Sequence, residues 1–214
     1  MASPWACASA SDCSVDWTFV YASRGRFWLR ATRVGKNGIK KLQRYMKDEA
    51  VDLWALDEVH FQQQESRCRM WIPPEDHDPV VFHHPTRQSV GYFGAVRLRD
   101  GRFFFRREVG RFHGETFWDF LRYLHPATVE PGRRVILISD HARYHRSRLH
   151  LTWRQQLQPQ LALDFLPPYS PELNPIERVW KLTRRLCLHN RYFGFLESVM
   201  EAVEVRFADW LKPN

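Results

Sequence analysis

Three short apolar runs stand out in the last three quarters of the chain, and they constrain the fold more than any other feature. They are VDLWALDEVHF (51–61), RRVILISD (133–140) and LALDFLPP (161–168). Each has the length and continuous apolar character of a strand buried on both faces. GETFWDFLRYLH (114–125) lies between the first two and has apolar residues at helical spacing. Strands that alternate with amphipathic helices in this way predict an α/β domain.

The segment between the first run and this helix has the character of antiparallel strands. SVGYFGAVRL (89–98) and RFFFRREV (102–109) flank an Asp-Gly pair, which predicts a hairpin. RCRMWIPP (67–74) predicts a further strand that its two prolines end. Helices are expected over 38–50, 145–158, 175–190 and 195–211. Together these segments predict a mixed sheet with helices on both faces.

A chain of 214 residues with 44% hydrophobic residues is long and apolar enough for one globular domain. Residues 46–214 carry the regular pattern and are expected to form that domain. Residues 1–45 form an atypical segment of Cys, Trp and Ser without clear periodicity. We expect this N-terminal segment to be poorly ordered.

The chain is strongly basic, and its positive charge is mostly arginine. Its 32 Lys and Arg against 24 Asp and Glu leave a net charge of +8, and 26 of the 32 cations are Arg. Because guanidinium groups bind phosphate oxygens in pairs, this composition favours a nucleic-acid partner. A GC-rich genome would explain the excess of Arg over Lys equally well, but it would not explain the excess of positive charge.

The four cysteines and the lack of long apolar stretches point to the cytoplasm. Cys7, Cys13, Cys68 and Cys187 form no Cys-x-x-Cys pair, so we expect reduced thiols and no zinc finger. Acidic residues interrupt the only early apolar stretch, which argues against a signal peptide. The sequence has no apolar run long enough to span a membrane.

Acidic residues stand where the apolar runs end. Asp57 and Asp140 close two of the runs, and Glu177 opens the helix that follows the third. Open α/β sheets bind ligands at the carboxyl ends of their strands, so the three acids are expected to meet there. Carboxylates suit hard divalent cations held against phosphate. The alternative is that these acids cap loops or helices.

Three blocks of the sequence resemble the signature blocks of DDE transposases. They are LDEVHF (56–61), LISDHARYHRS (137–147) and FLPPYSPELNPIERVWKLTRR (165–185). They are similar in particular to the mariner-like enzymes of bacterial insertion sequences, the insertion-sequence six-thirty group. The interval of 177 − 140 = 37 residues between the last two acids fits that superfamily. The resemblance covers residues 41–214 and implies a ribonuclease H-like α/β fold, a mixed five-stranded sheet with helices on both faces.

The resemblance also implies an activity and its site. Asp57, Asp140 and Glu177 would be the catalytic acids that bind two Mg²⁺ (or Mn²⁺) ions. Water would cut the phosphodiester at the element end, and the freed 3′-hydroxyl would attack target DNA. The implied partners are terminal inverted repeats, target DNA and a second copy in a homodimer, in a nucleoid-associated bacterial protein. The alternatives are an inactive remnant that binds DNA or a partner subunit, and a structure-selective nuclease.

Two features depart from the family pattern. The second block has His141 where the group usually has Asn, which is either a tolerated variant or a residue that contacts a ligand or DNA. Residues 1–45 do not resemble the family's N-terminal helix-turn-helix. Either a separately encoded helix-turn-helix subunit supplies that function, or the chain is a truncated remnant.

Basic residues cluster directly after two of the acids and are expected to contact the DNA backbone. The alternative for any one of them is a solvated helix face. Beside Asp57, Glu58 should point to the other face of its strand as an ion-pair or capping partner, and Asn174 either caps the next helix or is a plain turn residue. The basic residues are Arg143, Arg146, Arg148, Arg178, Lys181, Arg184 and Arg185.

Overall fold

The structure, a computed structural model, describes residues 33–64, 68, 82, 86–168, 170 and 173–211, with side chains from Gly38 onward. Their core is a five-stranded sheet of order β3-β2-β1-β4-β5. β1 runs antiparallel to β2 and parallel to β4, so the sheet is mixed, as predicted. The strands are β1 (Val51–Gln62), β2 (Ser89–Arg97), β3 (Phe103–Glu108), β4 (Arg134–Ser139) and β5 (Leu161–Phe165).

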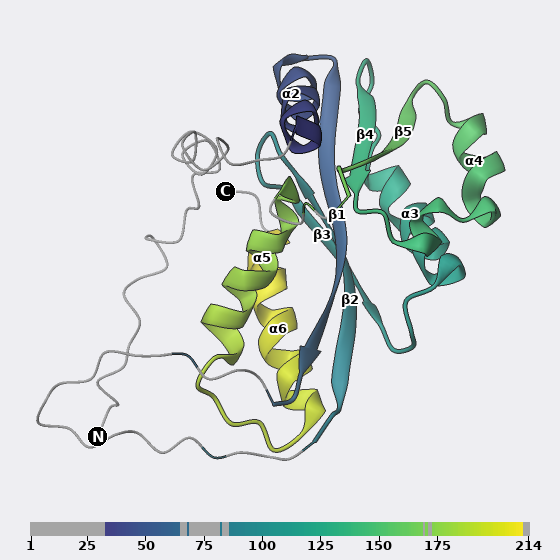
Figure 1. Cartoon of the computed structure of the whole chain (residues 1–214). Helices are drawn as coiled ribbons and strands as arrows, with labels where there is room; N and C mark the ends of the chain where they lie inside the picture. The colour runs from purple at the N-terminus through teal and green to yellow at the C-terminus, as the bar shows by residue number, and fades with distance from the viewer. Residues whose placement is uncertain are drawn as a thin grey trace, which may run out of the picture.

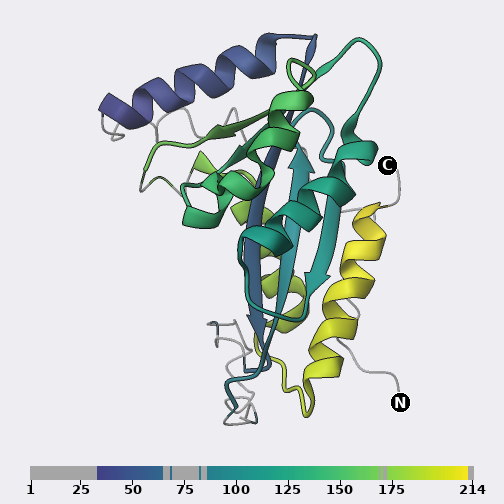
Figure 2. The same ribbon diagram turned by 90° about the vertical axis from the view of Figure 1, so that its right-hand side faces the viewer.

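Helices cover both faces of this sheet, which confirms the predicted α/β architecture (Figure 1). Helices α2, α5 and α6 lie on one face, and α3 and α4 lie on the other, which faces the viewer in Figure 2. None of the described helices is both long enough and apolar enough to cross a bilayer. The helices are α2 (Arg33–Lys47), α3 (Gly114–Thr128), α4 (Leu151–Gln156), α5 (Ile176–Thr183) and α6 (Leu196–Leu211).

The central strand β1 divides the core into two apolar clusters. Leu53 and Phe61 face the cluster formed with α5 and α6, whereas Trp54 and Leu56 face the cluster formed with α3. Successive side chains of a strand point to opposite faces, so a strand with helices on both sides is apolar at nearly every position. The continuous apolar run in the sequence has this cause.

The hairpin between β2 and β3 forms where the Asp-Gly pair predicts it. Gly101 has a positive φ of 76°, a conformation that costs little only for a residue without a side chain. The turn closes through Arg97 N–H, which donates to Arg102 O at 2.8 Å. The expected strand over 67–74 lies outside the described residues, apart from Cys68.

Several elements differ from their predicted form. The helix expected over 145–158 is instead two short 3₁₀ turns, Arg143–Arg146 and Arg148–His150, followed by α4. Ser147 separates the two turns in an extended conformation, and its hydroxyl accepts from Leu149 N–H. Where one helix is expected over 175–190, the structure has α5 as far as Thr183, followed by a π-helical turn, Arg184–Leu188.

The third apolar run was predicted to be fully buried, and this prediction is wrong. β5 is the edge strand beyond β4, and only Leu161 of its residues is fully buried. At the N-terminal side, α2 begins at Arg33 and crosses the expected boundary at residue 45. Its Ile39 and Leu42 belong to the core. The disorder expected for 1–45 falls mostly on residues that the structure does not describe.

Candidate active site

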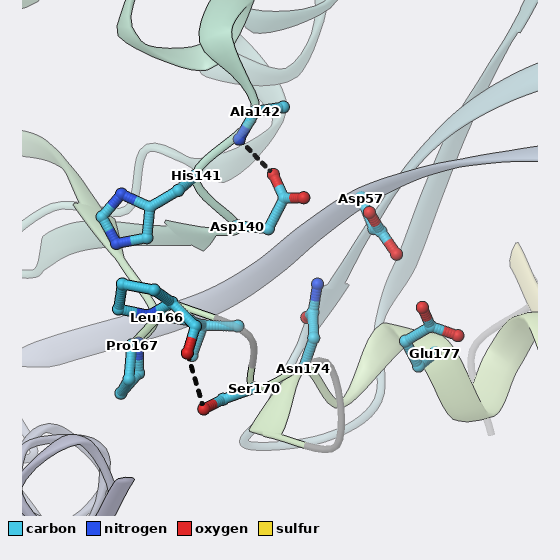
Figure 3. A pocket seen from close by; sticks show the side chains of 10 residues that line it. Asp57, Asp140, His141, Ala142, Leu166, Pro167, Ser170, Asn174 and Glu177 are labelled. Atoms are coloured by element: carbon cyan, nitrogen blue, oxygen red, sulfur yellow. Dashed lines mark hydrogen bonds between the residues drawn. The ribbon is translucent and has the colours of Figure 1, made fainter. Parts of the chain in front are cut away.

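The three acids singled out in the sequence line one cleft of about 480 Å³, seen in Figure 3. Asp57 comes from β1, Asp140 follows β4, and Glu177 lies in the first turn of α5. Segments up to 120 residues apart thus contribute to a single cavity (177 − 57 = 120). The remaining lining residues are His141, Ala142, Leu166, Pro167, Pro168, Ser170 and Asn174.

Asp57 does not end its strand, as the sequence suggested, but lies in the middle of it. β1 continues to Gln62 in antiparallel pairing with β2, whereas its parallel pairing with β4 stops at Ala55. Asp57 therefore lies just beyond the end of β4, where the sheet opens. A longer partner strand on the other side keeps β1 extended past this point, about as far as the apolar run over 51–61 predicts.

Asp57 is mostly buried among other acids. Its Oδ2 lies 3.3 Å from the indole nitrogen of Trp180, which donates to it from α5. Burial, followed by the negative charges of Glu58, Glu177 and Asp140, raises the pKa of Asp57 to about 8. A carboxyl group in this setting keeps its proton at neutral pH unless a cation compensates the charge.

Asp140 is in the opposite electrostatic state. Its Oδ1 accepts from Ala142 N–H at 2.9 Å and lies 2.8 Å from Nδ1 of His145. The hydrogen bond from His145 lowers the pKa of Asp140, and although burial opposes this, the Ala142 N–H adds to the effect. The carboxylate of Asp140 is therefore charged and is held through one of its two oxygens.

Glu177 is positioned by the buried residues around it. Ile176 and Trp180 anchor α5 in the core. Asn174 does not cap the helix; its Nδ2 donates 3.0 Å to the carbonyl of Leu56, the residue before Asp57. This bond ties the start of the Glu177 helix to the strand that carries Asp57. The Oδ1 of Asn174 is buried and has no hydrogen-bond partner within the described residues.

Glu58 points to the other face of β1 as predicted, where it meets residues that the sequence did not single out. Tyr144 donates a hydrogen bond to Glu58 Oε1, and Nε2 of His145 lies 3.4 Å from Glu58 Oε2. That last contact is an ion pair, and its geometry is not that of a hydrogen bond. His141, which departs from the family pattern, lies in the cleft and stacks on Phe165 at 5.3 Å.

The three acids share the cleft, but they are not grouped tightly enough to form a cation site. Within the described part of the chain, no three carboxylate, imidazole or thiol side chains lie close enough together to hold one metal ion.

The chain matches the sequence model of the DDE superfamily endonuclease family over residues 52–200, which is more than half its length. The chain belongs to the DDE superfamily endonuclease family. Residues 52–200 include all three acids of the cleft.

The chain is also similar to individual proteins. The chain is 41% identical over 73 residues to an uncharacterized protein, y4pE/y4sA, of Sinorhizobium fredii, which covers 34% of this chain and 50% of that protein. The Mos1 mariner paired-end complex with Mn has a TM-score of 0.57 and 17% identity, covering 89% of this chain and 63% of the Mos1 chain. The Mos1 strand transfer complex has a TM-score of 0.53 and 18% identity, with 88% and 62% covered.

The Mos1 similarity confirms the ribonuclease H-like fold of this DDE family member. The chain spans half of the Sinorhizobium protein that it matches and less than two thirds of each Mos1 chain.

The basic residues expected to contact DNA follow Asp140 and Glu177 in the chain and do not line the DDE cleft. Of the described side chains, Arg143, Arg146 and Arg148 are exposed on the two 3₁₀ turns after Asp140. On α5 and the π-helical turn after it, Lys181 and Arg185 are exposed, and Arg178 and Arg184 are partly buried. None of these seven described residues is among those that line the cleft.

Two of these arginines have structural contacts as well. Arg184 donates to the carbonyl of His60 at 3.3 Å and lies over the ring of Phe61. Arg146 lies over the ring of Phe165, 5.9 Å from its centre. Arg184 thus also supports the end of β1.

Proposed function

We propose that the chain is the catalytic domain of a DNA transposase. It would hydrolyse phosphodiester bonds at element ends with divalent metal ions and transfer the freed strands to target DNA. The observation that carries this proposal is the gathering of Asp57, Asp140 and Glu177 in one cleft of a DDE family fold. A metal-dependent endonuclease needs oxygen ligands near a phosphate, and distant segments of this chain contribute three acids to this cleft.

The residues of the cleft fit a pair of Mg²⁺ (or Mn²⁺) ions in their chemistry. All three are oxygen ligands, which both ions prefer. Burial, followed by the charges of neighbouring acids, raises the pKa of Asp57, and a bound cation would offset both effects. The buried Oδ1 of Asn174 lacks a donor and would suit an ion-bound water. Two structural neighbours are a Mos1 complex with Mg and a Mos1 complex with Mn.

Each residue then has a defined task. Asp57, Asp140 and Glu177 would hold the ions. When bound, the ions supply Lewis-acid activation of water or of a 3′-hydroxyl and stabilise the leaving oxygen. Trp180 holds the Asp57 carboxyl by its indole N–H, and Asn174 keeps α5 in register with β1. Binding of the ions by all three acids would require their carboxyl groups to come closer together, because no three such side chains of the described residues are grouped tightly enough to hold one ion.

DNA would follow the exposed basic residues on both sides of the cleft. Arg143, Arg146 and Arg148 would take one stretch of backbone, and Lys181 and Arg185 the other. The net charge of +8 supports attraction to DNA. Terminal inverted repeats and target DNA are the substrates in this proposal. Membership of the insertion-sequence six-thirty group, a homodimer and a separately encoded helix-turn-helix subunit belong to the same proposal.

A cleavage and joining assay tests this function. Duplexes that carry the inverted repeats flanking the gene are incubated with the wild type and with Asp140→Asn, in Mg²⁺, in Mn²⁺ or in EDTA. We expect nicking and joining by the wild type with either metal, and none in EDTA or with the variant. Asp119→Asn is the matched control, because it makes the same chemical change on α3, where Asp119 pairs with Arg122. Equal activity of wild type and Asp140→Asn would remove the assignment.

An inactive DNA-binding remnant is the second candidate. The observation that favours it is the lack of a preformed ion-binding group among the described residues. A remnant would bind DNA with strong salt dependence and would not nick it at any metal concentration.

A further inference from the structure

A histidine of the loop after β4, His145, is buried in the protein and contacts Asp140. His145 is only 1% exposed. Its Nδ1 lies 2.8 Å from Asp140 Oδ1 and 2.8 Å from Ser139 Oγ, and its Nε2 lies 3.4 Å from Glu58 Oε2. One imidazole thus contacts a carboxylate on each side, one from the loop and one from β1.

Aromatic rings hold the imidazole in this position. The rings of Phe117 and Tyr144 flank the imidazole at 4.3 and 4.5 Å between centroids. The two ring nitrogens lie on opposite sides of the imidazole, so one side chain contacts both carboxylates.

The far end of this arrangement is fixed to the strand that bears Asp57. Glu58 is the next residue of β1, and the hydroxyl of Tyr144 donates to its other carboxyl oxygen. Tyr144 and His145 are neighbours in the same 3₁₀ turn. The turn is therefore held against β1 by two side chains, and Asp140 is held by that turn.

The orientation of Asp140 follows from these contacts. His145 and the Ala142 N–H both engage Oδ1. The other oxygen, Oδ2, points toward the side of the cleft where Asp57 lies (Figure 3). In metal sites, groups that hold a ligand from behind typically change metal affinity or activity by about 10- to 100-fold when removed.

We propose that His145 is a positioning residue for Asp140. It occupies Oδ1 of Asp140, and its contact with Glu58 ties the Asp140 carboxylate to β1, so that Oδ2 of Asp140 is presented to a cation. This inference rests on the proposed function, in which Asp140 is a metal ligand.

The two ring nitrogens can be tested separately. In His145→Asn, the side-chain amide nitrogen takes the place of Nδ1 and keeps a donor for Asp140. In His145→Gln, it takes the place of Nε2, near Glu58, and leaves Asp140 Oδ1 without that donor. His145→Ala removes both. His150→Gln is the control: His150 is equally buried in the neighbouring turn, and its Nε2 contacts only the carbonyl of Tyr144, at 3.2 Å.

The first measurement is Mn²⁺ affinity, from the free-ion signal in electron paramagnetic resonance, without DNA. The second is kcat and KM for cleavage. We expect His145→Ala and His145→Gln to bind Mn²⁺ about 10- to 100-fold more weakly and to lose kcat, with KM for DNA unchanged. His145→Asn should stay close to the wild type in both, as should His150→Gln.

The outcomes separate this inference from the proposed function. A wild type that binds no Mn²⁺ and cuts no DNA overturns the proposed function and, with it, the role of His145. An active wild type whose Asn and Gln variants are alike, whether both intact or both impaired, overturns the inference alone. Circular dichroism monitors folding; if the Ala variant is unfolded, the Asn and Gln pair decides, and if those also fail to fold, the role is structural and the proposal is wrong.

Discussion

Gly94 on β2 should tolerate no side chain, because the indole of Trp180 fills the space beside it. Gly94 pairs with Asp57 across the two strands. A Cβ built on Gly94 would lie 2.3 Å from Cη2 and 2.8 Å from Cζ2 of Trp180, and 3.1 Å from Cδ1 of Ile176. Carbon atoms do not approach this closely, so Gly94→Ala must displace the indole and with it α5.

The cost follows from how tightly Trp180 is held. Its ring is 1% exposed and contacts Phe61, Phe103 and Phe207, so it cannot move without disturbing the core. Forcing extra volume into such a core costs about 1–3 kcal/mol. The displaced indole would also lose its 3.3 Å bond to Asp57. We therefore expect Gly94→Ala to lower the free energy of unfolding by about 2–3 kcal/mol.

Urea unfolding followed by circular dichroism in EDTA measures this cost. Gly194→Ala is the control, because its Cβ would meet nothing nearer than 4.0 Å and should change stability by less than about 0.5 kcal/mol. In a Trp180→Phe background, where the outer indole atoms are gone, Gly94→Ala should cost about 1 kcal/mol less, a coupling expected of residues in contact. A cost of Gly94→Ala no larger than the control's, or equal in both backgrounds, would refute the reasoning.

Three further predictions concern single side chains. Because the pKa of Asp57 is raised in the folded protein, the contribution of this residue to stability is lost as pH rises from about 4 to 8. In EDTA, Asp57→Asn should therefore stabilise the protein at pH 8 by at least about 1 kcal/mol and leave the melting temperature unchanged near pH 4. A variant less stable than the wild type at pH 8 would contradict this. Burial alone would raise the pKa of Asp164, but hydrogen bonds donated from α2 outweigh it and lower the pKa, so the stabilisation by Asp164 is present above about pH 4 and disappears as pH falls further. Asp164→Asn should cost about 1 kcal/mol of stability at pH 7 and nothing at pH 2. An equal cost at both pH values would exclude the ion pair as the cause. Asn174→Ala leaves the carbonyl of Leu56 without its donor and should cost about 1–3 kcal/mol in thermal unfolding, and an unchanged melting temperature would show that this bond is not needed.

Local patterns in the sequence were enough for the five strands of the described sheet and the hairpin, and they selected three acids that line one cleft. The run from Val51 is apolar at nearly every position because helices cover both faces of β1, and that burial is written directly in residue type. The Asp-Gly pair predicts its turn because few residues other than glycine adopt the φ that Gly101 has. The acids were found because carboxylates at the ends of apolar runs are unusual, and because the blocks around them resemble a known family.

The tertiary structure decided everything that depends on which segments meet. The apolar run over 51–61 predicts that β1 continues beyond Asp57, but it does not show that β4 ends there and opens the sheet, since that depends on how the strands pair. The edge position of β5, not its composition, leaves it half exposed. Asn174 looked like a helix cap, yet its partner is a carbonyl 118 residues earlier in the chain. His145 shows no periodicity that marks it as buried, and its role comes from Glu58, 87 positions away (145 − 58 = 87). Residue type and periodicity record how much of a side chain is buried, whereas its partners are set by contacts between segments that no local pattern encodes.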